Sequence, residues 1–374
     1  MSDPMTIFLA GGGTGGHLYP GISVAQALRE ILPEAKVLFL CTEREIDRTI
    51  LEPTGFEFLT QPIVPPVKTV GGLLKFWSSW RATKDMLRKL FRERPPAAVL
   101  GLGGYAAGVA VKMASNRKIP AAILNPDVIP GKANQYLLRY VQAVCCQFEQ
   151  TSRYIPANRK DKIKITGCPI RSDILSLPPR AEAAKRLGLD PVLQTLVITG
   201  ASQGAATVND AAIATLTGMK LQGWQILHLS GKDHAAAVRQ RYHEADLSAA
   251  VVDFTPAMAD VWAVADLAIS RAGASSCAEL TACGIPSILM PYPFHKDMHQ
   301  RANAKVLVDS AAAILITDKK DIAKNKEKLR PAIESLIYDV PKRKSMSIAA
   351  KSLGKPDAAK NVAQVLREIV VVNR

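Results

Sequence analysis

The sequence lacks most features of secreted, membrane-spanning and nucleic-acid-binding proteins. Its six cysteines form no Cys-x-x-Cys pair and lie mostly in apolar runs, so we expect reduced thiols in a cytosolic protein. No apolar run reaches the roughly 18 residues of a membrane span, and no signal peptide is visible before the first strand. Zinc-finger spacings, RNA-binding aromatic motifs and an Arg-rich tail are also absent, which disfavours nucleic acid as a partner.

The sequence has fewer acidic than basic residues. The chain has 33 Asp and Glu against 48 Lys and Arg, which gives a formal net charge of +15. This excess predicts an acidic partner, and with nucleic acid disfavoured, an anionic membrane or a phosphorylated substrate remains. The length of 374 residues and the hydrophobic content of 48% predict two globular domains, each with its own core.

Four glycine-rich loops each follow an apolar strand and precede a helix; they lie at 11–16, 101–108, 200–205 and 271–276. Glycine lets a ligand approach the backbone, and the unpaired N–H groups of a first helical turn bind anions such as a diphosphate. Strands are expected at 5–10, 36–41, 97–100, 120–124, 143–147, 163–166, 195–199, 225–229, 250–254, 265–270 and 287–290. Their alternation with helices predicts parallel sheets, whose ligands bind at the carboxyl ends of the strands.

The first loop has two interpretations. Gly11, Gly13 and Gly16 match the dinucleotide pattern GxGxxG, and Glu43 near the end of the second strand could bind a ribose, as in a nicotinamide-dependent enzyme. His17 does not fit that role, because a histidine just inside such a loop is expected to face a ligand. A hydrogen-bonded structural histidine is the alternative. Pro20 predicts the start of the following helix.

The loop that begins at Arg271 is the second candidate anion site. A short strand precedes it, and a helix is expected from Cys277 to Cys283, ended by Gly284. Glu279 is expected about one turn into the helix, where its carboxylate could accept from ribose hydroxyls. The alternative is an ordinary junction between strand and helix, with Glu279 as a solvated acid.

The segment 70–94 differs from the rest of the first half. Leu73, Trp77, Trp80, Leu87 and Phe91 recur at helical spacing, among seven Lys and Arg and two acidic residues, a net charge of +5. The pattern predicts an amphipathic helix that lies on an anionic membrane surface. A core helix with a solvated basic face remains the alternative, because both tryptophans could pack inward.

Two similar halves with glycine-rich loops predict an α/β protein of the GT-B architecture, in which two Rossmann-like parallel-sheet domains face each other across a cleft. We expect an N-terminal domain at 1–166, a C-terminal domain at 167–355, and a helix at 356–374 that packs back on the first domain. No Asp-x-Asp metal motif occurs, so a sugar-nucleotide enzyme of this kind is expected to need no metal or cofactor. Helix N-termini and Arg would stabilise the departing diphosphate instead.

Several motifs, in chain order, resemble those of the MurG family. They are Gly12 to His17, Gly101 to Tyr105, Gly167 to Arg171, Ser202 to Ala205, Arg271 to Glu279, and His299-Gln300 with Asn303-Ala304. This family consists of peripheral membrane N-acetylglucosaminyltransferases of peptidoglycan synthesis. The resemblance implies inverting transfer of GlcNAc from UDP-GlcNAc to the muramyl 4-hydroxyl of lipid I, a polyprenyl-pyrophosphate acceptor. Lipid II would form at the cytoplasmic face of the cell membrane, in support of cell shape and division.

The resemblance also implies a role for individual residues. His17 would be the catalytic base, a task that suits its ordinary pKa of about 6.5. Donor binding would involve Thr14, Gly15, Gly16, Asp127, Arg171, Ser202, Thr255, Ala274, Ser275, Ser276, Glu279 and Gln300. Of these, Arg171 and Ser202 would contact the diphosphate region, Thr255 would lie near the uracil, Glu279 would bind the ribose and Gln300 the sugar. The Gly103-Gly104-Tyr105 loop would face the acceptor pyrophosphate.

The sequence departs from the family at two places. The stretch Leu124-Asn125-Pro126-Asp127 replaces the usual His-Glu-Gln-Asn, and Asp127 cannot donate hydrogen bonds as the family's Asn does. The third loop has Thr199-Gly200-Ala201-Ser202 where Gly-Gly-Ser is usual. Three hypotheses therefore stay open: a lipid I GlcNAc transferase, a UDP-sugar transferase with another lipid acceptor, and a non-catalytic paralogue that binds a nucleotide sugar as a membrane scaffold.

Overall fold

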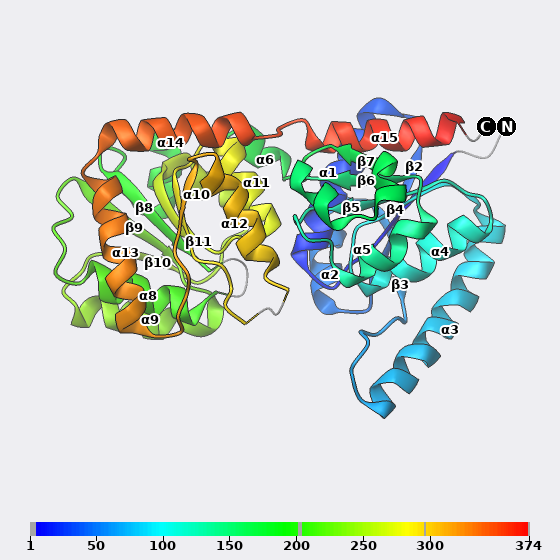
Figure 1. The fold of residues 1–374 in the computed structure, drawn as a ribbon, viewed down its shortest axis with the longest axis horizontal. Helices are drawn as coiled ribbons and strands as arrows, with labels where there is room; N and C mark the ends of the chain where they lie inside the picture. The colour runs from blue at the N-terminus through cyan, green and yellow to red at the C-terminus, as the bar shows by residue number, and fades with distance from the viewer. Residues whose placement is uncertain (1–4, 201–203, 295–296, 373–374) are drawn as a thin grey trace. The chain divides into compact units, whose positions relative to one another are not determined.

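The computed structural model describes residues 5–200, 204–294 and 297–372, and contacts divide the chain into two compact units. The first unit consists of Met1–Arg171 and Pro356–Arg374, and the second of Ser172–Lys355 (Figure 1). The division therefore falls after Arg171, whereas the boundary predicted from the sequence lies between 166 and 167. The segment 356–374 belongs to the first unit.

A seven-stranded parallel sheet forms the centre of the first unit. Its strands are β1 (Thr6–Ala10), β2 (Lys36–Thr42), β3 (Glu57–Gln61), β4 (Pro96–Gly101), β5 (Ala121–Asn125), β6 (Ala143–Cys146) and β7 (Ile163–Ile165). They lie in the order β3-β2-β1-β4-β5-β6-β7. From β1 the chain adds strands towards one edge of the sheet as far as β3, and from β4 it adds them towards the other edge. Open α/β sheets bind ligands at the carboxyl ends of the two strands at such a switch point, here β1 and β4. The loops at 11–16 and 101–108 follow these two strands.

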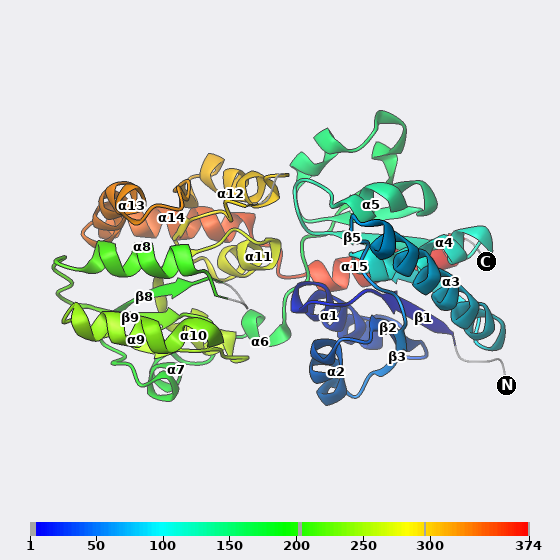
Figure 2. The ribbon, with the colours of Figure 1, turned by 90° about the horizontal axis from the view of Figure 1, so that it is seen from below.

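Helices cover both faces of this sheet (Figure 2). They are α1 (Gly15–Ile31), α2 (Glu45–Leu51), α3 (Val70–Glu93), α4 (Gly108–Asn116), α5 (Lys132–Leu137) and α15 (Ala358–Val372), with short 3₁₀ helices η1 (Glu52–Thr54), η2 (Tyr105–Ala107), η3 (Leu138–Tyr140), η4 (Glu149–Tyr154) and η5 (Ala157–Lys162). Alternate side chains of β1 point to opposite faces of the sheet. Ile7 and Leu9 pack with α1 and α15, and Phe8 packs with α3 and α4. Helix α15 is thus part of the first unit's core, alongside α1.

Helix α1 begins earlier than the sequence predicted. Pro20 was expected to open it, but the helix starts at Gly15, after Thr14 in an extended conformation. Pro20 lies inside the second turn and is buried. Its missing N–H removes only the bond to the Gly16 carbonyl, so the glycine-rich turn, and not the proline, sets the start of the helix.

The second unit repeats the plan with a six-stranded parallel sheet. Its strands are β8 (Gln194–Thr199), β9 (Trp224–Leu229), β10 (Ala250–Val252), β11 (Ala265–Ser270), β12 (Ser287–Leu289) and β13 (Ala313–Leu315), in the order β10-β9-β8-β11-β12-β13. Its helices are α6 (Ser172–Leu175), α7 (Arg180–Leu187), α8 (Ala206–Leu216), α9 (Ala235–Glu244), α10 (Met258–Val264), α11 (Ala274–Cys283), α12 (His299–Asp309), α13 (Ile322–Ile337) and α14 (Val340–Leu353), with η6 (Lys232–His234). The switch point lies between β8 and β11, the strands before the loops at 200–205 and 271–276.

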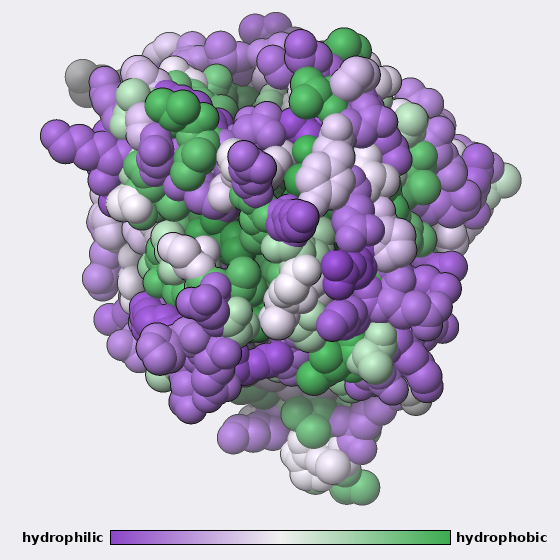
Figure 3. Space-filling view, turned by 90° about the vertical axis from the view of Figure 1, so that its left-hand side faces the viewer, coloured by the Kyte–Doolittle hydropathy of each residue, from purple (hydrophilic) through white to green (hydrophobic). Residues whose placement is uncertain are grey.

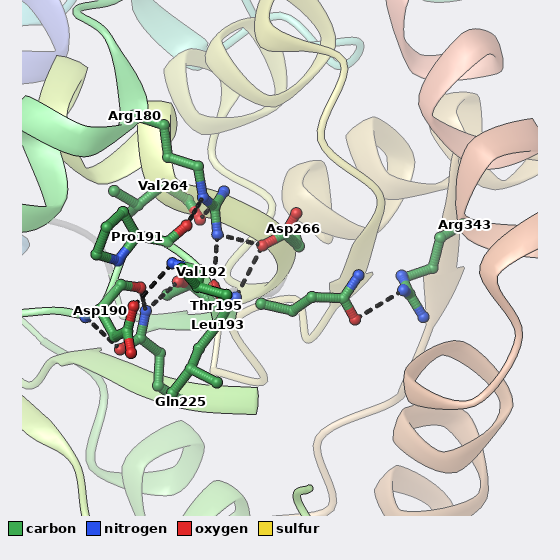
Figure 4. Close-up of polar contacts among 11 residues, drawn as sticks. Arg180, Asp190, Pro191, Val192, Leu193, Thr195, Gln225, Val264, Asp266 and Arg343 are labelled. Carbon is green, nitrogen blue, oxygen red and sulfur yellow. Dashed lines mark hydrogen bonds and ion pairs between the residues drawn. The ribbon is translucent and has the colours of Figure 1, made fainter. Parts of the chain in front are cut away.

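Two arginines tie helices to the amino-terminal ends of these strands (Figure 4). Arg180 of α7 donates to the Val264 and Leu193 carbonyls and to Asp266, at 2.8–2.9 Å. Arg343 of α14 donates to Gln194 at 2.9 Å and stacks over the Trp224 ring at 4.8 Å. The amino ends of the strands are therefore held by structural contacts, and the candidate residues lie at the carboxyl ends.

The side of this unit where α9 and α13 lie is mostly hydrophilic around a smaller apolar area (Figure 3).

Candidate active site

A buried aspartate holds the first glycine-rich loop in place. Asp47 of α2 is fully buried and accepts from the Gly13 N–H at 2.7 and 2.9 Å, and from the Thr42 N–H and hydroxyl at 2.8 and 2.7 Å. A Cβ on Gly12 would lie 2.2 Å from Asp47 Oδ2, so the carboxylate can approach this closely only because Gly12 has no side chain. In the nicotinamide interpretation of the sequence, Glu43 is the acid that binds a ribose. Glu43 is exposed, and Asp47, one turn further, holds the loop.

His17 lies in the first turn of α1, against the backbone of the loop after β4. Its Nδ1 lies 3.1 Å from the Gly12 carbonyl oxygen and 3.3 Å from Thr14 Oγ1. A Cβ on Gly103 would lie 3.0 Å from the His17 ring, and one on Gly104 would lie 3.1 Å from it. Both glycines have positive φ, +111° and +70°, so the loop conformation and the close approach of the ring both favour glycine. We call Asp47, Gly12, His17, Gly103 and Gly104 the His17 cluster.

The contacts of the His17 ring determine where its proton lies. Because a carbonyl oxygen only accepts, Nδ1 carries the proton that faces Gly12, which leaves Nε2 with the basic lone pair. Burial lowers the pKa of His17, although the Gly12 carbonyl and the charges of Asp127 and Asp47 act in the opposite direction. With its pKa lowered, the ring is neutral at pH 7 and can accept a proton at Nε2.

Asp127 lies two residues after β5. Its backbone carbonyl accepts from Asn125 Nδ2 at 2.8 Å and from the Thr151 hydroxyl at 3.4 Å. Its side chain is half-buried, and its charge partly opposes the lowering of the His17 pKa by burial. A pocket in the first unit is lined by Gly16, Pro20, Leu102, Leu124, Asn125, Pro126, Cys145, Gly167, Cys168 and Pro169. The stretch in which the sequence departs from the MurG family therefore lies beside the N-terminal turns of α1.

Tyr105 and Arg171 are the other candidate side chains of the first unit. Tyr105 begins η2, and burial raises the pKa of its hydroxyl. The guanidinium of Arg171 lies 5.2 Å from the centre of the Tyr19 ring, which belongs to α1. Arg171 is thereby held next to the helix whose first turn contains Thr14, Gly15, Gly16 and His17. Thr14 and Gly16 are exposed, and Gly15 is half-buried against Tyr19.

In the second unit, the loop after β11 leads directly into α11. This helix begins at Ala274, so Ala274, Ser275 and Ser276 form its first turn, three residues earlier than the predicted start at Cys277. Gly273 precedes them without a capping side chain. The first N–H groups of a helix point along its axis and not into its ladder of backbone bonds, which is the arrangement that binds anions. Glu279 lies in the second turn and accepts from the Trp262 indole N–H at 2.8 Å, so a neighbouring aromatic residue orients its carboxylate.

The remaining predicted donor residues lie on other loops of the second unit. Gln300 is in the first turn of α12, and its Oε1 accepts from the Tyr292 N–H at 2.9 Å. Thr255 lies between β10 and α10 and accepts from the Ala257 N–H at 3.0 Å. Ser202 lies outside the described residues. Both loops follow the carboxyl ends of strands, so Thr255 and Gln300 lie at the same end of the sheet as Ser275.

Arg271, the first residue of the predicted anion loop, is buried inside the second unit. Its Nη1 donates to the Met290 carbonyl at 2.8 Å and to Asp318 at 2.9 Å, and its Nη2 donates to the Thr207 hydroxyl at 2.7 Å. Arg271 and Asp318 are only 4% and 5% exposed. Burial raises the pKa of Asp318, but hydrogen bonds from Thr207, Lys320 N–H, Asn325 and Arg271 outweigh it and lower the pKa overall. We call Arg271, Asp318 and Thr207 the Arg271 network; nothing in the sequence patterns indicated that they meet.

Helix α3 combines the two predicted alternatives. Its C-terminal half is a core helix, with Leu87, Leu90 and Phe91 buried, and Trp80 lies against Gly108 of α4. Its N-terminal half exposes apolar side chains: Val70, Leu73, Leu74 and Trp77 are 80%, 45%, 67% and 59% exposed. Figure 1 shows this half extending away from the sheet of the first unit. Trp77 therefore points to solvent and Trp80 packs inward.

In residues 5–200, 204–294 and 297–372, no group of three or more His, Cys, Asp or Glu is arranged to hold a metal ion. Within the same ranges, every helix is too short or too polar to span a bilayer.

The chain matches the glycosyltransferase family 28 N-terminal domain over residues 7–146 and the C-terminal domain of that family over residues 195–362. With the two parallel sheets, these matches define a glycosyltransferase of the GT-B architecture. The nicotinamide alternative, based on Gly11, Gly13, Gly16 and Glu43, is therefore wrong. A crystal structure of Acinetobacter baumannii MurG has a similar fold, with a TM-score of 0.76 and 24% identity over 98% of this chain and 100% of that one.

Similar proteins of known name indicate which group of glycosyltransferases the chain belongs to. A UDP-N-acetylglucosamine–N-acetylmuramyl-(pentapeptide) pyrophosphoryl-undecaprenol N-acetylglucosamine transferase from Halothermothrix orenii is 35% identical over 97% of this chain and 99% of its own length. The protein of the same name from Bacillus pumilus is 33% identical over 98% of this chain and 99% of its own length. The chain belongs to this family of transferases, as the sequence motifs predicted.

Proposed function

We propose that this protein transfers GlcNAc from UDP-GlcNAc to lipid I, undecaprenyl-pyrophosphoryl-MurNAc-pentapeptide, and so forms lipid II in peptidoglycan synthesis. The full-length match to relatives named for this reaction supports the proposal. The observation that carries the chemistry is the His17 cluster, in which a neutral imidazole is fixed with Nδ1–H on the Gly12 carbonyl.

In the proposed reaction, His17 Nε2 takes the proton of the muramyl 4-hydroxyl. The oxygen then attacks the anomeric carbon of GlcNAc, the bond to the UDP oxygen breaks, and the configuration at that carbon inverts. A base of this kind contributes about 10²–10⁴-fold to the rate. The Gly103-Gly104-Tyr105 loop, which contacts the His17 ring, holds the acceptor pyrophosphate near the base.

The donor is bound mainly by the second unit. The first-turn N–H groups of α11, at Ala274, Ser275 and Ser276, stabilise the diphosphate together with Arg171, Ser202 and the Thr14-Gly15-Gly16 turn. Glu279 accepts from the ribose hydroxyls, Thr255 lies near the uracil and Gln300 binds the sugar. In support of the ribose assignment, the Trp262 indole already orients the Glu279 carboxylate, which lowers the cost of ordering it on binding.

Asp127 is the residue at which this chain differs from the family pattern for the sugar. As an anion, it accepts from sugar hydroxyls and cannot donate to them, so it selects a different set of contacts from an asparagine. This difference favours a second candidate function, transfer of a UDP-sugar to another polyprenyl or diacylglycerol lipid. Its charge also adds basicity to His17.

The exposed part of α3 supports peripheral binding to the cytoplasmic face of the cell membrane. Trp77, Leu73 and Leu74 expose apolar surface beside Lys75 and Arg81, both exposed. Aromatic and apolar side chains with flanking basic residues bind anionic bilayers, and each Lys or Arg near the surface contributes about 1 kcal/mol.

The deciding experiment measures transfer of radiolabelled GlcNAc from UDP-GlcNAc to lipid I, with and without anionic vesicles. Lipid II should form, and anionic vesicles should increase the rate. Transfer to another lipid but not to lipid I would favour the second candidate. UDP binding without transfer to any lipid would identify a non-catalytic paralogue. His17→Ala should retain UDP affinity while its turnover falls at least about 10²-fold; unchanged turnover would exclude His17 as the base.

A further inference from the structure

The Arg271 network joins four loops at the carboxyl end of the second sheet. Arg271 follows β11, its Nη1 reaches the Met290 and Pro291 carbonyls after β12, and Asp318 follows β13. Thr207 lies in the first turn of α8, directly after the loop at 200–205. The buried guanidinium of Arg271, which itself follows β11, is thus bonded to the segments that follow β8, β12 and β13.

The hydroxyl of Thr207 completes this network. It donates to Asp318 Oδ2 at 2.5 Å and accepts from Arg271 Nη2 at 2.7 Å, so it bridges the two ends of the ion pair. Asp318 also accepts from the Lys320 N–H and from Asn325, at 2.9 and 3.0 Å, which fix its carboxylate. The hydroxyl is the only part of Thr207 that these contacts use. The link between α8 and the ion pair can therefore be cut without removing either charge.

A role in stability alone does not account for this arrangement. Desolvation of two charges offsets most of their attraction, so a buried ion pair stabilises a fold little compared with apolar residues of the same size. What the directional bonds do supply is a fixed position for each of the segments that they join. The two helix starts tied most directly are the first turns of α8, through Thr207, and of α11, through the loop that begins at Arg271. Ser275, in the first turn of α11, is a diphosphate-binding residue of the proposed function. Small displacements of such groups cause large losses in binding and rate.

We propose that Thr207 and Asp318 are positioning residues of the UDP-GlcNAc site, which act through Arg271 to hold the first turn of α8 and the loop before α11 in the geometry that receives the diphosphate. The inference rests on the proposed donor site of the second unit. It makes neither residue a ligand of the donor.

The test compares three substitutions in α8 of the full-length protein. Thr207→Val removes the bridging hydroxyl and keeps the shape, and Thr207→Ser keeps the hydroxyl and removes the methyl group. Thr215→Val is the matched control, because Thr215 is fully buried in the same helix and its hydroxyl donates only to the Ala211 carbonyl, at 2.6 Å. UDP affinity is measured by calorimetry, KM for UDP-GlcNAc and kcat by the transfer assay, and stability by the melting temperature.

Thr207→Val should weaken UDP binding and raise KM for UDP-GlcNAc by about tenfold, the effect of losing a hydrogen bond to a charged group, with a smaller change in kcat. Thr207→Ser should stay within about twofold of the wild type, and Thr215→Val should lower the melting temperature without changing UDP affinity. Equal UDP affinity of Thr207→Val and the wild type would overturn the inference, as would a loss in Thr207→Ser that matches the valine variant. A wild-type protein that does not bind UDP would instead refute the proposed donor site.

Discussion

The two units share a strand order but hold their glycine-rich loops by different means. In the first unit, the Asp47 carboxylate bonds directly to the loop backbone at Gly13, where the neighbouring Gly12 leaves room for it. In the second unit, the Asp318 carboxylate reaches the loop through the Arg271 side chain and the Thr207 hydroxyl. Both devices put a buried acid behind a loop proposed to bind phosphate.

The difference lies in how each acid is neutralised. Asp47 is balanced by backbone N–H groups and a hydroxyl, with no cation paired to it. Burial lowers the pKa of His17, the proposed base, and the charge of Asp47 partly opposes that shift. Asp318 is paired with Arg271, and the pair presents no net charge to the diphosphate that the second unit is proposed to bind. A carboxylate without a cation thus lies near the proposed base, and a neutralised carboxylate lies behind the proposed anion site.

Removing the paired acid should have the largest effect. Asp318→Ala leaves the Arg271 charge buried without its partner, and breaking a buried pair in this way costs about 3–5 kcal/mol. Urea unfolding should show this loss in the free energy of unfolding. The double variant Asp318→Ala/Arg271→Met should recover much of it, and a double variant no more stable than the single would contradict the buried-charge explanation.

Removing the unpaired acid should cost less. Asp47→Ala leaves the Gly13 and Thr42 N–H groups unsatisfied but no uncompensated charge, so we expect a loss of about 2–4 kcal/mol in the free energy of unfolding. Turnover should fall as well, because the Gly12 carbonyl that orients His17 loses its support. A loss larger than that of Asp318→Ala under the same urea conditions would reverse the comparison.

The histidines of the two units also differ, because His17 has a partner at Nδ1 whereas both ring nitrogens of His228 are hydrogen-bonded inside the second unit. His228 of β9 is fully buried, accepts at Nδ1 from Tyr242 and donates from Nε2 to Asn209, and burial lowers its pKa to about 3. Its unfolded pKa of about 6.5 is higher, so the unfolded chain binds the extra proton. The stability from neutral His228 is complete above pH 6.5 and is lost as the pH falls from 6.5 towards 3, at up to about 1.4 kcal/mol per pH unit.

The pH dependence can be assigned to His228 by substitution. Because the pKa of His17 is lowered too, the slope is measured in a His17→Ala background, with and without His228→Gln. The second substitution should flatten the slope of unfolding free energy against pH below 6.5, whatever it does to the stability at pH 7. A slope that does not change would show that other groups titrate there.

The smallest effect on stability is expected at α3. The double variant Leu74→Ser/Trp77→Ser changes exposed side chains, so the free energy of unfolding should stay within about 0.5 kcal/mol. Co-sedimentation with anionic vesicles should weaken at least about tenfold, since burying a leucine alone contributes about 1.5–3 kcal/mol. Ile348→Ser, at a 71% exposed apolar position of the second unit, is the control and should bind vesicles normally.

The sequence was sufficient for features that are local in the chain. Apolar runs followed by glycine-rich loops located the central strands and the site loops, and the motif order predicted the family. The edge strands β3 and β13 were missed, because Glu57–Gln61 is only partly buried and Ala313–Leu315 has three residues. A short or half-exposed edge strand lacks the continuous apolar pattern of a central one.

What the sequence could not reveal depends on contacts between distant residues. Asp47 lies 34 positions from Gly13, and Asp318 lies 47 from Arg271 and 111 from Thr207. Each looks like an ordinary surface acid in the sequence until the fold brings its partners together. The split between Trp77 and Trp80 has the same cause, since Trp80 packs inward against Gly108 of α4, a neighbour that the sequence alone does not reveal.

Helix α15 gives the chain an unusual order of assembly during synthesis. Val362 and Leu366 belong to the core of the first unit, yet they follow the whole of Ser172–Lys355 in the sequence. A ribosome that adds ~5–20 residues per second needs roughly ten to forty seconds to make that intervening stretch. Throughout that interval α1 keeps an uncovered apolar flank, while the continuous inner stretch can already collapse by itself. The portion translated first is therefore the one whose core is completed last.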